Sequence, residues 1–183
     1  MISTNKEVIL DLLNAFQSGD DKSFSKLYDI YADVLFNYGC CLTQDKELIK
    51  DCIHDVFIKL YTKRAEQKIN NVSSYLFVSL KNRLLDEFRR RTFMSETPAE
   101  DVHNTLMDQG VETEYLKMEK DSGQKNRVNF LLNNLTPRQR EAFTLYYIEE
   151  RKYDEICDIM NMNYHSVRNL VHRGMLKLRE VVK

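Results

Sequence analysis

Polar side chains that can recognise DNA recur along one face of a predicted helix near the C-terminus. Arginine can bind guanine through two hydrogen bonds, asparagine can bind adenine, and Ser166 near the helix start can hold a phosphate. No acidic residue occurs between His165 and Arg179, whereas an ordinary solvated face mixes both signs of charge. The residue types therefore predict a DNA-reading helix. Its candidate contacts are His165, Ser166, Arg168, Asn169, His172, Arg173 and Lys177.

Two predicted helices and a tight turn position these side chains. In the turn, Asn161 can adopt the left-handed conformation that usually requires glycine, and Asn163 can cap the following helix. The apolar residues of the second helix fall within about 100° of arc, opposite the polar face. This pattern predicts a helix-turn-helix, and the alternative is an ordinary helical hairpin with a solvated face. The apolar residues are Tyr153, Ile156, Ile159 and Met160 on the first helix and Val167, Leu170, Val171, Gly174 and Leu178 on the second.

A bundle of helices is predicted for the N-terminal part of the chain, up to about Arg91. A short helix over residues 7–17 ends at Gly19, and Ser73 and Ser74 suit the N-cap of the last helix. The sequence has 5 Gly and 2 Pro and lacks strand-like alternation of useful length, which favours long helices. The three apolar stripes are Phe24, Leu27, Tyr28, Tyr31, Leu35, Tyr38 and Leu42; Ile49, Ile53, Val56, Phe57 and Leu60; and Phe77, Leu80, Leu84 and Phe88.

Charge is strongly segregated along the chain, although the formal net charge is −1. Residues 81–91 contain five basic and two acidic residues, and residues 162–183 contain five basic and one acidic. Residues 92–121 between them contain eight acidic and two basic residues. This distribution predicts two basic surfaces joined by an acidic linker. We also hypothesise from charge alone that Glu96, Glu100 and Asp101 let the linker mask a basic DNA-binding face.

Helical character returns after the linker, near Glu112. Thr136 then supplies a capping hydroxyl, Pro137 suits the first helical position, and Gln139 completes a capping box. These residues predict the start of the helix that carries Ala142 and leads into the helix-turn-helix.

Several functional classes find no support in the sequence. It contains no Gly-rich phosphate loop, no metal-ligand cluster and no nucleophile with a paired base, so we expect no enzyme, cofactor or metal site. It also lacks a secretory signal and an apolar membrane-spanning run. The cysteines (Cys40, Cys41, Cys52 and Cys157) form no CxxC pair, which predicts reduced, mostly buried thiols in a cytoplasmic protein.

Two stretches of the chain resemble the extracytoplasmic-function (group four) sigma factors of bacterial RNA polymerase. Leu-Thr at 135–136, Arg-Glu at 140–141, YDEI at 153–156, Val-Arg at 167–168 and Lys-Leu-Arg at 177–179 are similar to their region four. SFSKLYDIYADVLFNYG, DCIHDVFIKLY and SSYLFVSLKNRLLDEFRRR resemble their region two. Two departures are His54 and Tyr61, where the family usually has glutamine and tryptophan, and a third is Lys152, where Ser or Thr often caps the helix.

The resemblance implies an all-α protein that binds core RNA polymerase, recognises the −35 and −10 promoter elements, and promotes DNA melting and transcription initiation. It implies a region-two bundle over residues 1–91, a linker over 92–111 and a region-four domain over 112–183. An anti-sigma partner is implied in the same way. The polymerase-binding residues would be Asp51, His54, Asp55, Phe57 and Ile58. The residues at the −10 element would be Asn70, Asn71, Ser73, Lys81, Asn82, Arg89, Arg90 and Arg91.

Alternatives stay open at this point. Phe57 is equally well explained as a core residue, and three arginines are favourable at any helix C-terminus. A helix-turn-helix activator that acts beside polymerase would explain the C-terminal half, but it would leave residues 22–91 without a role.

Overall fold

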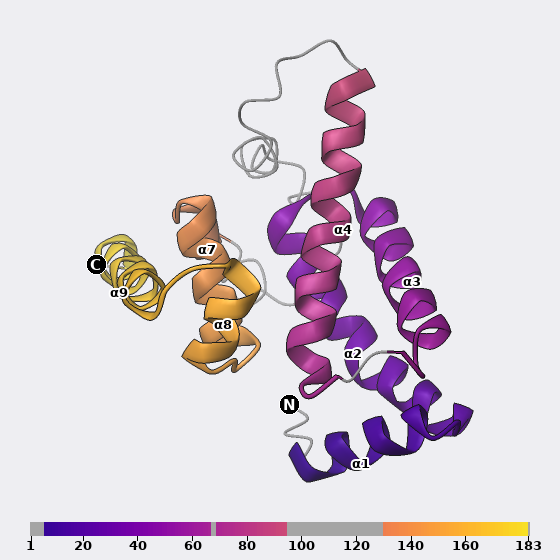
Figure 1. Cartoon of the computed structure of the whole chain (residues 1–183). Coiled ribbons are helices and arrows are strands. Elements are labelled where there is room, and N and C mark those ends of the chain that lie inside the picture. Colours follow the sequence, from indigo (N-terminus) through magenta and orange to yellow (C-terminus); the bar gives the residue numbers. More distant parts are fainter. Residues whose placement is uncertain (1–5, 67–68, 95–129, 183) are drawn as a thin grey trace, which may run out of the picture. The chain divides into compact units, whose positions relative to one another are not determined.

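The computed structural model describes residues 6–66, 69–94 and 130–182, and all regular secondary structure in these ranges is helical. The all-α prediction is therefore confirmed. The helices are α1 (Lys6–Gln17), α2 (Asp21–Leu42), α3 (Lys46–Thr62), α4 (Val72–Met94), α7 (Pro137–Phe143), the π-helix η3 (Thr144–Ile148), α8 (Tyr153–Met160) and α9 (Tyr164–Val182) (Figure 1). None of the described helices is long and apolar enough to cross a membrane.

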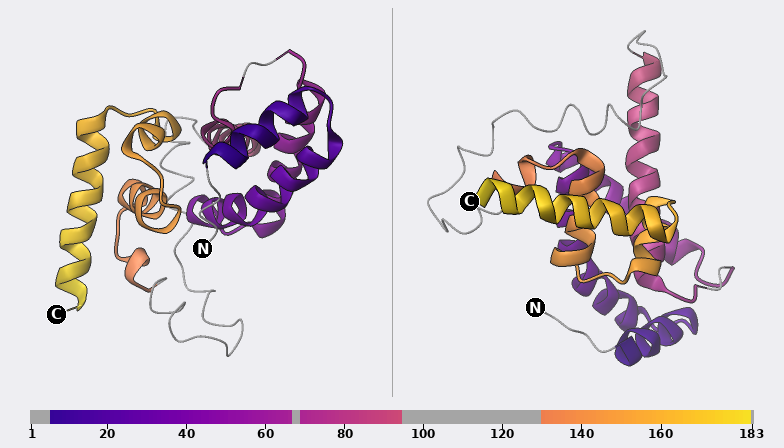
Figure 2. Two further views of the ribbon diagram at one scale, coloured as in Figure 1. Left: turned by 90° about the horizontal axis from the view of Figure 1, so that it is seen from below. Right: turned by 90° about the vertical axis from the view of Figure 1, so that its left-hand side faces the viewer.

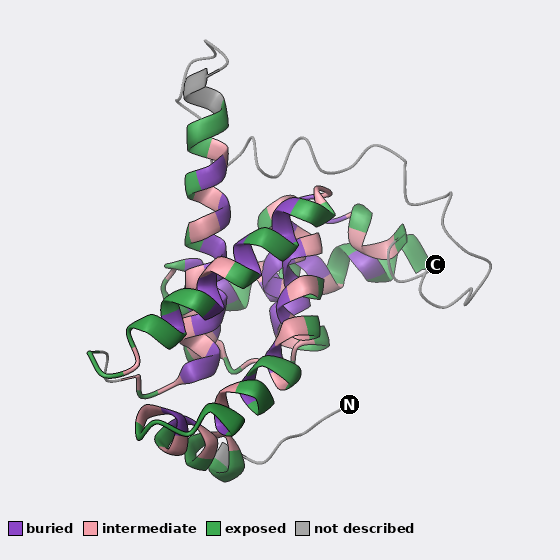
Figure 3. Ribbon diagram, turned by 90° about the vertical axis from the view of Figure 1, so that its right-hand side faces the viewer, coloured by how far each residue is buried: buried purple, intermediate pink, exposed green. Residues whose placement is uncertain are grey.

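The chain divides into two compact units, of residues 1–40 with 45–84 and of residues 41–44 with 85–183. In the first unit, α1 to α4 bury their apolar stripes against one another, so each helix has a buried and an exposed side (Figure 3). Its largest fully buried side chains are Leu13, Phe16, Leu27, Tyr31, Leu35, Tyr38, Ile49, Leu60, Leu76, Phe77, Leu80 and Leu84. The predicted stripes are confirmed as core, except that Tyr28 is exposed and Phe24 and Phe88 are half-buried.

Glycine is required where α2 passes close to α3. A Cβ atom on Gly39 would lie 2.5 Å from Cγ2 of Ile49, a separation that real side chains do not adopt. Ile49 is fully buried at this position. Gly39 therefore allows the two helices to approach more closely than any other residue would permit.

Short polar side chains cap the helices of the first unit. Gly19, with φ of 108°, ends α1 as predicted, and Asp45 accepts a hydrogen bond from the Leu48 N–H at 3.0 Å to start α3. The predicted N-cap of α4 was wrong. Asn71, not Ser73 or Ser74, accepts the capping bond, from the Ser74 N–H at 3.1 Å. Asn71 suits this place because its side-chain oxygen reaches the free N–H groups of the first turn.

The second unit contains the predicted succession of short helices. Thr136 starts α7 in a capping box, in which its N–H donates to Oε1 of Gln139 at 3.1 Å, as the sequence predicted. The helix then widens into the π-turn η3, where the Glu149 N–H donates to the Thr144 carbonyl at 3.0 Å. No residue pattern predicted this turn or the positive φ of 52° at Glu150 that follows it. The long helix α9 closes the unit and is seen from two sides in Figure 2.

The cysteines are all free thiols, but only Cys52 is buried, while Cys40, Cys41 and Cys157 are half-buried. The prediction of mostly buried cysteines was therefore too strong. Burial and the nearby carboxylates of Asp154 and Asp158 raise the pKa of Cys157, which disfavours its reactive thiolate.

Candidate nucleic-acid interface

The turn between α8 and α9 has the predicted conformation. Asn161 adopts the left-handed region with φ 51° and ψ 52° and ends α8. The Met162 N–H donates to the Cys157 carbonyl at 3.0 Å, which closes the helix end. Asn163 then accepts a hydrogen bond from the Ser166 N–H at 2.8 Å and so caps α9. Both asparagine predictions are confirmed, and together they set the direction in which α9 begins.

The two faces of α9 differ as the sequence predicted. Val167, Val171, Gly174 and Leu178 are buried against the preceding helices, and Leu170 is half-buried. The opposite face exposes the predicted DNA contacts His165, Arg168, Asn169, His172, Arg173 and Lys177, while Ser166 is half-buried. The helix contains no acidic residue before Glu180. The separation of faces is confirmed, and the contacts of these side chains with DNA stay a prediction.

The helix α8 supports α9 and has an unusual start. Lys152 occupies its N-cap position, and a lysine side chain cannot accept a hydrogen bond from the first turn. Glu155 compensates, because its Oε2 accepts a hydrogen bond from the Lys152 N–H at 3.2 Å. Asp154 and Glu155 also place negative charge at the positive end of the helix. The departure at Lys152 is thus accommodated locally.

A ladder of aromatic rings, which the sequence analysis missed, joins η3, α8 and α9. The centroids of Tyr146 and Tyr153 are 4.7 Å apart, and those of Tyr153 and Tyr164 are 5.3 Å apart. Burial and the neighbouring Tyr146 raise the pKa of the Tyr153 hydroxyl. Tyr164 is 45% exposed beside His165. Periodicity could not find the ladder, because its rings come from three separate elements.

Arg140 has a structural position in this unit. Its Nε donates to the Leu132 carbonyl at 3.1 Å, and its Nη2 lies 3.5 Å from the Leu135 carbonyl. The side chain therefore caps the carboxyl end of the helical turn that precedes α7, where cations and donors are favourable.

The residues predicted for the −10 element are only partly at the surface. Asn70, Asn82, Arg89, Arg90 and Arg91 are exposed, and Asn71 is half-buried as a helix cap. The assignments of two other residues to an open DNA-binding surface were wrong. Ser73 is 6% exposed and Lys81 is 7% exposed, because both lie on sides of α4 that pack inward.

Arg89 and Arg90 each pair with an acidic residue of α4. Arg89 Nη1 lies 3.2 Å from Oδ1 of Asp86, and Arg90 Nη2 lies 2.7 Å from Oε2 of Glu87. These exposed guanidinium groups keep further donors that could bind phosphate. The net positive charge of this helix end is nevertheless smaller than three arginines suggest.

The polymerase-binding candidates on α3 also divide by burial. Asp51, His54 and Ile58 are exposed. Phe57 is 2% exposed and packs its ring against Tyr28 at 4.7 Å, so the prediction that it contacts a partner was wrong, and the alternative of a core residue holds. Asp55 is half-buried and pairs with Arg83 of α4, a residue that the sequence analysis did not single out.

The described residues contain no group of three or more His, Cys, Asp or Glu side chains that could hold a metal ion. Hydrogen-bond donors are exposed on α9 and at the end of α4, and on α3 the apolar side chain of Ile58 is exposed together with Asp51 and His54. Their arrangement suits binding to nucleic acid and to another protein through a helix face.

Comparison with known proteins agrees with this arrangement. The family model described as Sigma-70 region 2 matches residues 27–93, and the model described as Sigma-70, region 4 matches residues 125–178. The ECF RNA polymerase sigma factor SigM of Bacillus subtilis is 24% identical over 157 residues, which cover 86% of this chain and 93% of SigM. SigW of the same organism, also an ECF RNA polymerase sigma factor, is 22% identical over 175 residues, covering 91% of this chain and 92% of SigW.

Two solved structures share the fold. CnrH in complex with the cytosolic domain of CnrY has a TM-score of 0.65 at 17% identity and covers 96% of this chain and 97% of CnrH. The sigma factor RpoE in complex with the anti-sigma factor NepR, from Bartonella quintana, has a TM-score of 0.65 at 21% identity, covering 88% of this chain and 97% of RpoE.

Proposed function

This chain belongs to the extracytoplasmic-function group of the sigma-70 family, whose role is promoter recognition and transcription initiation, and from this premise we propose how its residues divide that work. The region-two bundle, over residues 1–91, binds core RNA polymerase and opens the −10 element. The linker covers residues 92–111. Residues 95–129 lie outside the described residues, so the return of helical character near Glu112 stays a prediction. The region-four domain, over residues 112–183, reads the −35 element. The protein is not an enzyme and acts in the cytoplasm.

The −35 element is read by the exposed face of α9. The single observation that carries this proposal is a long, acid-free helix face with arginine, asparagine and histidine side chains in solvent. Such a helix fits the major groove of B-DNA, where arginine and asparagine distinguish base pairs. Ser166 and the capped first turn would bind a phosphate of the DNA backbone.

The −10 element is opened by a smaller set of residues than the sequence alone predicted. Asn70 and Asn82 are exposed and can bind an extruded base, while Arg89 to Arg91 hold the separated strand. Core polymerase is bound through Asp51, His54 and Ile58 on α3. An acidic and apolar helix face of this kind suits an amphipathic partner helix that carries arginines.

An anti-sigma protein is a further proposed partner. Support comes from the similarity in fold to RpoE, whose structure was solved in complex with the anti-sigma factor NepR.

Transcription in vitro tests the proposed function directly. The purified chain is added to core RNA polymerase with a randomised promoter library, and the transcripts are sequenced. We expect initiation without any other sigma factor and enrichment of two separated sequence elements. Initiation that requires another sigma factor would instead indicate an activator that acts beside polymerase.

A further inference from the structure

Tyr164 is an exposed aromatic residue at the leading end of the proposed DNA-reading helix. It is the first residue of α9, and it is 45% exposed. Arg168 follows four residues later, a spacing that makes two side chains neighbours on one side of a helix. The His165 ring lies edge-on to the Tyr164 ring, with the centroids 6.3 Å apart. Tyr164 therefore borders the exposed donors that are proposed to read the −35 element.

These donors leave one feature of the major groove unread. The other exposed side chains in the first half of α9 are histidine, arginine and asparagine, which recognise base edges through hydrogen bonds. Thymine also presents a methyl group in the major groove, and this group is recognised by apolar contact. The other large exposed apolar side chains of α9 are Leu176, Val181 and Val182, which lie in the second half of the helix. An apolar contact at the start of the described helix therefore has to come from Tyr164.

The ladder of aromatic rings holds Tyr164 in place. The centroid of Tyr153 lies 5.3 Å from that of Tyr164, with the ring planes inclined by 55°, and Tyr146 lies 4.7 Å from Tyr153, inclined by 30°. Both supporting rings are half-buried. Asn163 fixes the adjacent backbone, because it caps α9 through the Ser166 N–H at 2.8 Å. The Tyr164 ring is thus oriented in the free protein, which reduces the conformational entropy lost on binding.

We propose that Tyr164 is a specificity-determining residue, whose ring contacts the methyl group of a thymine of the −35 element in the major groove. Tyr153 is a positioning residue that holds this ring. The inference rests on the proposed reading of the −35 element by α9. Tyrosine can also donate to a DNA phosphate, but Ser166 and Lys177 already offer donors for phosphate, whereas the apolar contact has no other source at the start of α9.

Replacement of thymine by uracil tests the contact, because it removes the methyl group and keeps the base pairing. The −35 element is first identified by selection from the randomised promoter library. Each thymine of the element, in either strand, is then replaced singly by uracil. The affinity of reconstituted holoenzyme is measured for each promoter.

The variants are Tyr164→Ala, which removes the ring, Tyr164→Phe, which removes only the hydroxyl, and Tyr153→Leu, which removes the supporting ring. The matched control is Leu176→Ala, because Leu176 is an equally exposed apolar residue of the same helix. Helicity and core polymerase affinity are measured alongside. The ratio of the thymine and uracil affinities separates the contact from misfolding, because a smaller active fraction weakens binding to both promoters equally.

With wild type, uracil at one position should weaken binding by about three- to fivefold, the factor that corresponds to the loss of one buried methyl group. Tyr164→Ala should abolish this difference, because the methyl group then has no partner. Tyr153→Leu should reduce it, since the Tyr164 ring is less well held. Tyr164→Phe and Leu176→Ala should keep the wild-type difference.

The proposal would be overturned if no uracil substitution weakened the binding of wild type, or if the difference persisted in Tyr164→Ala. Tyr164→Phe as impaired as Tyr164→Ala would also overturn it and would indicate a phosphate contact through the hydroxyl. An undiminished difference in Tyr153→Leu would overturn the positioning role of Tyr153. A wild-type chain without any −35 preference would instead refute the proposed function of α9.

Discussion

Asp55 and Arg83 join α3 to α4 through two contacts, because Nε and Nη2 of the arginine each lie 2.9 Å from Oδ2 of the aspartate. Asp55 is a predicted polymerase-binding residue, and the pair gives it a second role within the bundle. A substitution at this position therefore changes the fold and the partner surface together, and other residues are needed to separate the two effects.

Asp55→Arg should lower the stability of the bundle, because it places two guanidinium groups together where a pair existed. With side-chain exposures of 36% and 45%, the loss should be about 1 kcal/mol rather than the larger value of a buried pair. Thermal unfolding followed by circular dichroism measures it. Exchange of the charges by adding Arg83→Asp should recover most of the loss, and a double variant no more stable than Asp55→Arg alone would contradict the prediction.

Asp51→Arg and Ile58→Glu should weaken binding to core polymerase without changing stability, since both side chains are exposed on α3. Loss of a central apolar contact or reversal of a charge at an interface typically weakens binding by about 1–3 kcal/mol. Affinity is measured by titration with labelled core polymerase. Glu7→Arg, an exposed charge reversal on α1, is the control. Wild-type affinity in both α3 variants would exclude this face.

Arg168→Ala and Arg173→Ala should each lower affinity for the −35 element by about 1–3 kcal/mol if the side chain reads a base edge. The substitution should also relax the preference at one position of the DNA. An equal loss on every sequence, with a smaller salt dependence, would show a phosphate contact instead. Arg179→Ala, on an exposed residue near the end of α9, provides the comparison.

Gly39→Ala and Gly174→Ala should change stability in opposite directions. The new methyl group at Gly39 would meet Cγ2 of Ile49 at 2.5 Å and force α2 and α3 apart, at a cost of about 1–3 kcal/mol. At Gly174 the nearest atom, Cδ2 of Phe143, lies at an ordinary 3.6 Å, so the higher helix propensity of alanine should stabilise α9 by about 0.5–1 kcal/mol. Denaturant unfolding of both variants measures the difference, and destabilisation of equal size at both positions would be the contrary result.

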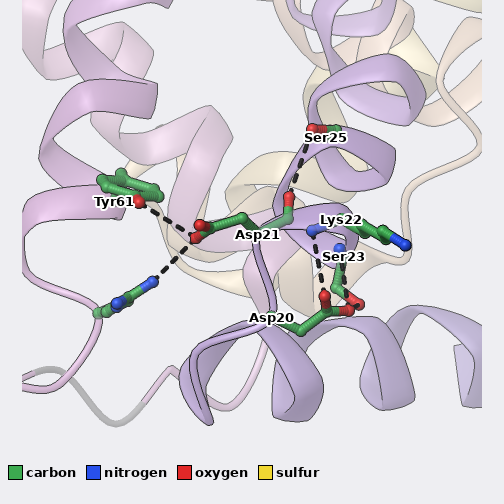
Figure 4. Close-up of polar contacts among 7 residues, drawn as sticks. Asp20, Asp21, Lys22, Ser23, Ser25 and Tyr61 are labelled. Carbon is green, nitrogen blue, oxygen red and sulfur yellow. Dashed lines mark hydrogen bonds and ion pairs between the residues drawn. The ribbon is translucent and has the colours of Figure 1, made fainter.

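Asp20 should make the start of α2 sensitive to acid. A hydrogen bond from the Ser23 hydroxyl, at 2.6 Å, holds the pKa of the Asp20 carboxyl below its ordinary value (Figure 4). Because the pKa is lowered in the folded state, the stabilisation is present above about pH 4 and is lost as the pH falls through the folded value. Asp20→Asn keeps a side-chain oxygen that can cap the helix but has no group that titrates. The stability of this variant should therefore fall less in acid than that of wild type. The unfolding free energies of wild type and Asp20→Asn are compared from about pH 5 to about pH 2.5. An equal fall in both proteins would contradict this prediction. Ser23→Ala should weaken the dependence.

Local features of the sequence determined most of the helices and several of their ends. The capping residues Thr136 and Asn163 and the left-handed Asn161 act within one turn of the chain, so their types and spacing were sufficient. The exposed face of α9 could be predicted for the same reason, because the positions of Val167 and Val171 define its buried side at a period of 3.6 residues.

Only the tertiary structure decided which side chains next to the buried faces of the helices are exposed to partners. Phe57 and Lys81 are buried and Asp55 pairs with Arg83, because helices distant in sequence pack on those sides. The tyrosine ladder from Tyr146 to Tyr164 arises in the same way. Periodicity identifies an apolar face, but the extent of its burial depends on the shape and proximity of the neighbouring helices, which no local pattern contains.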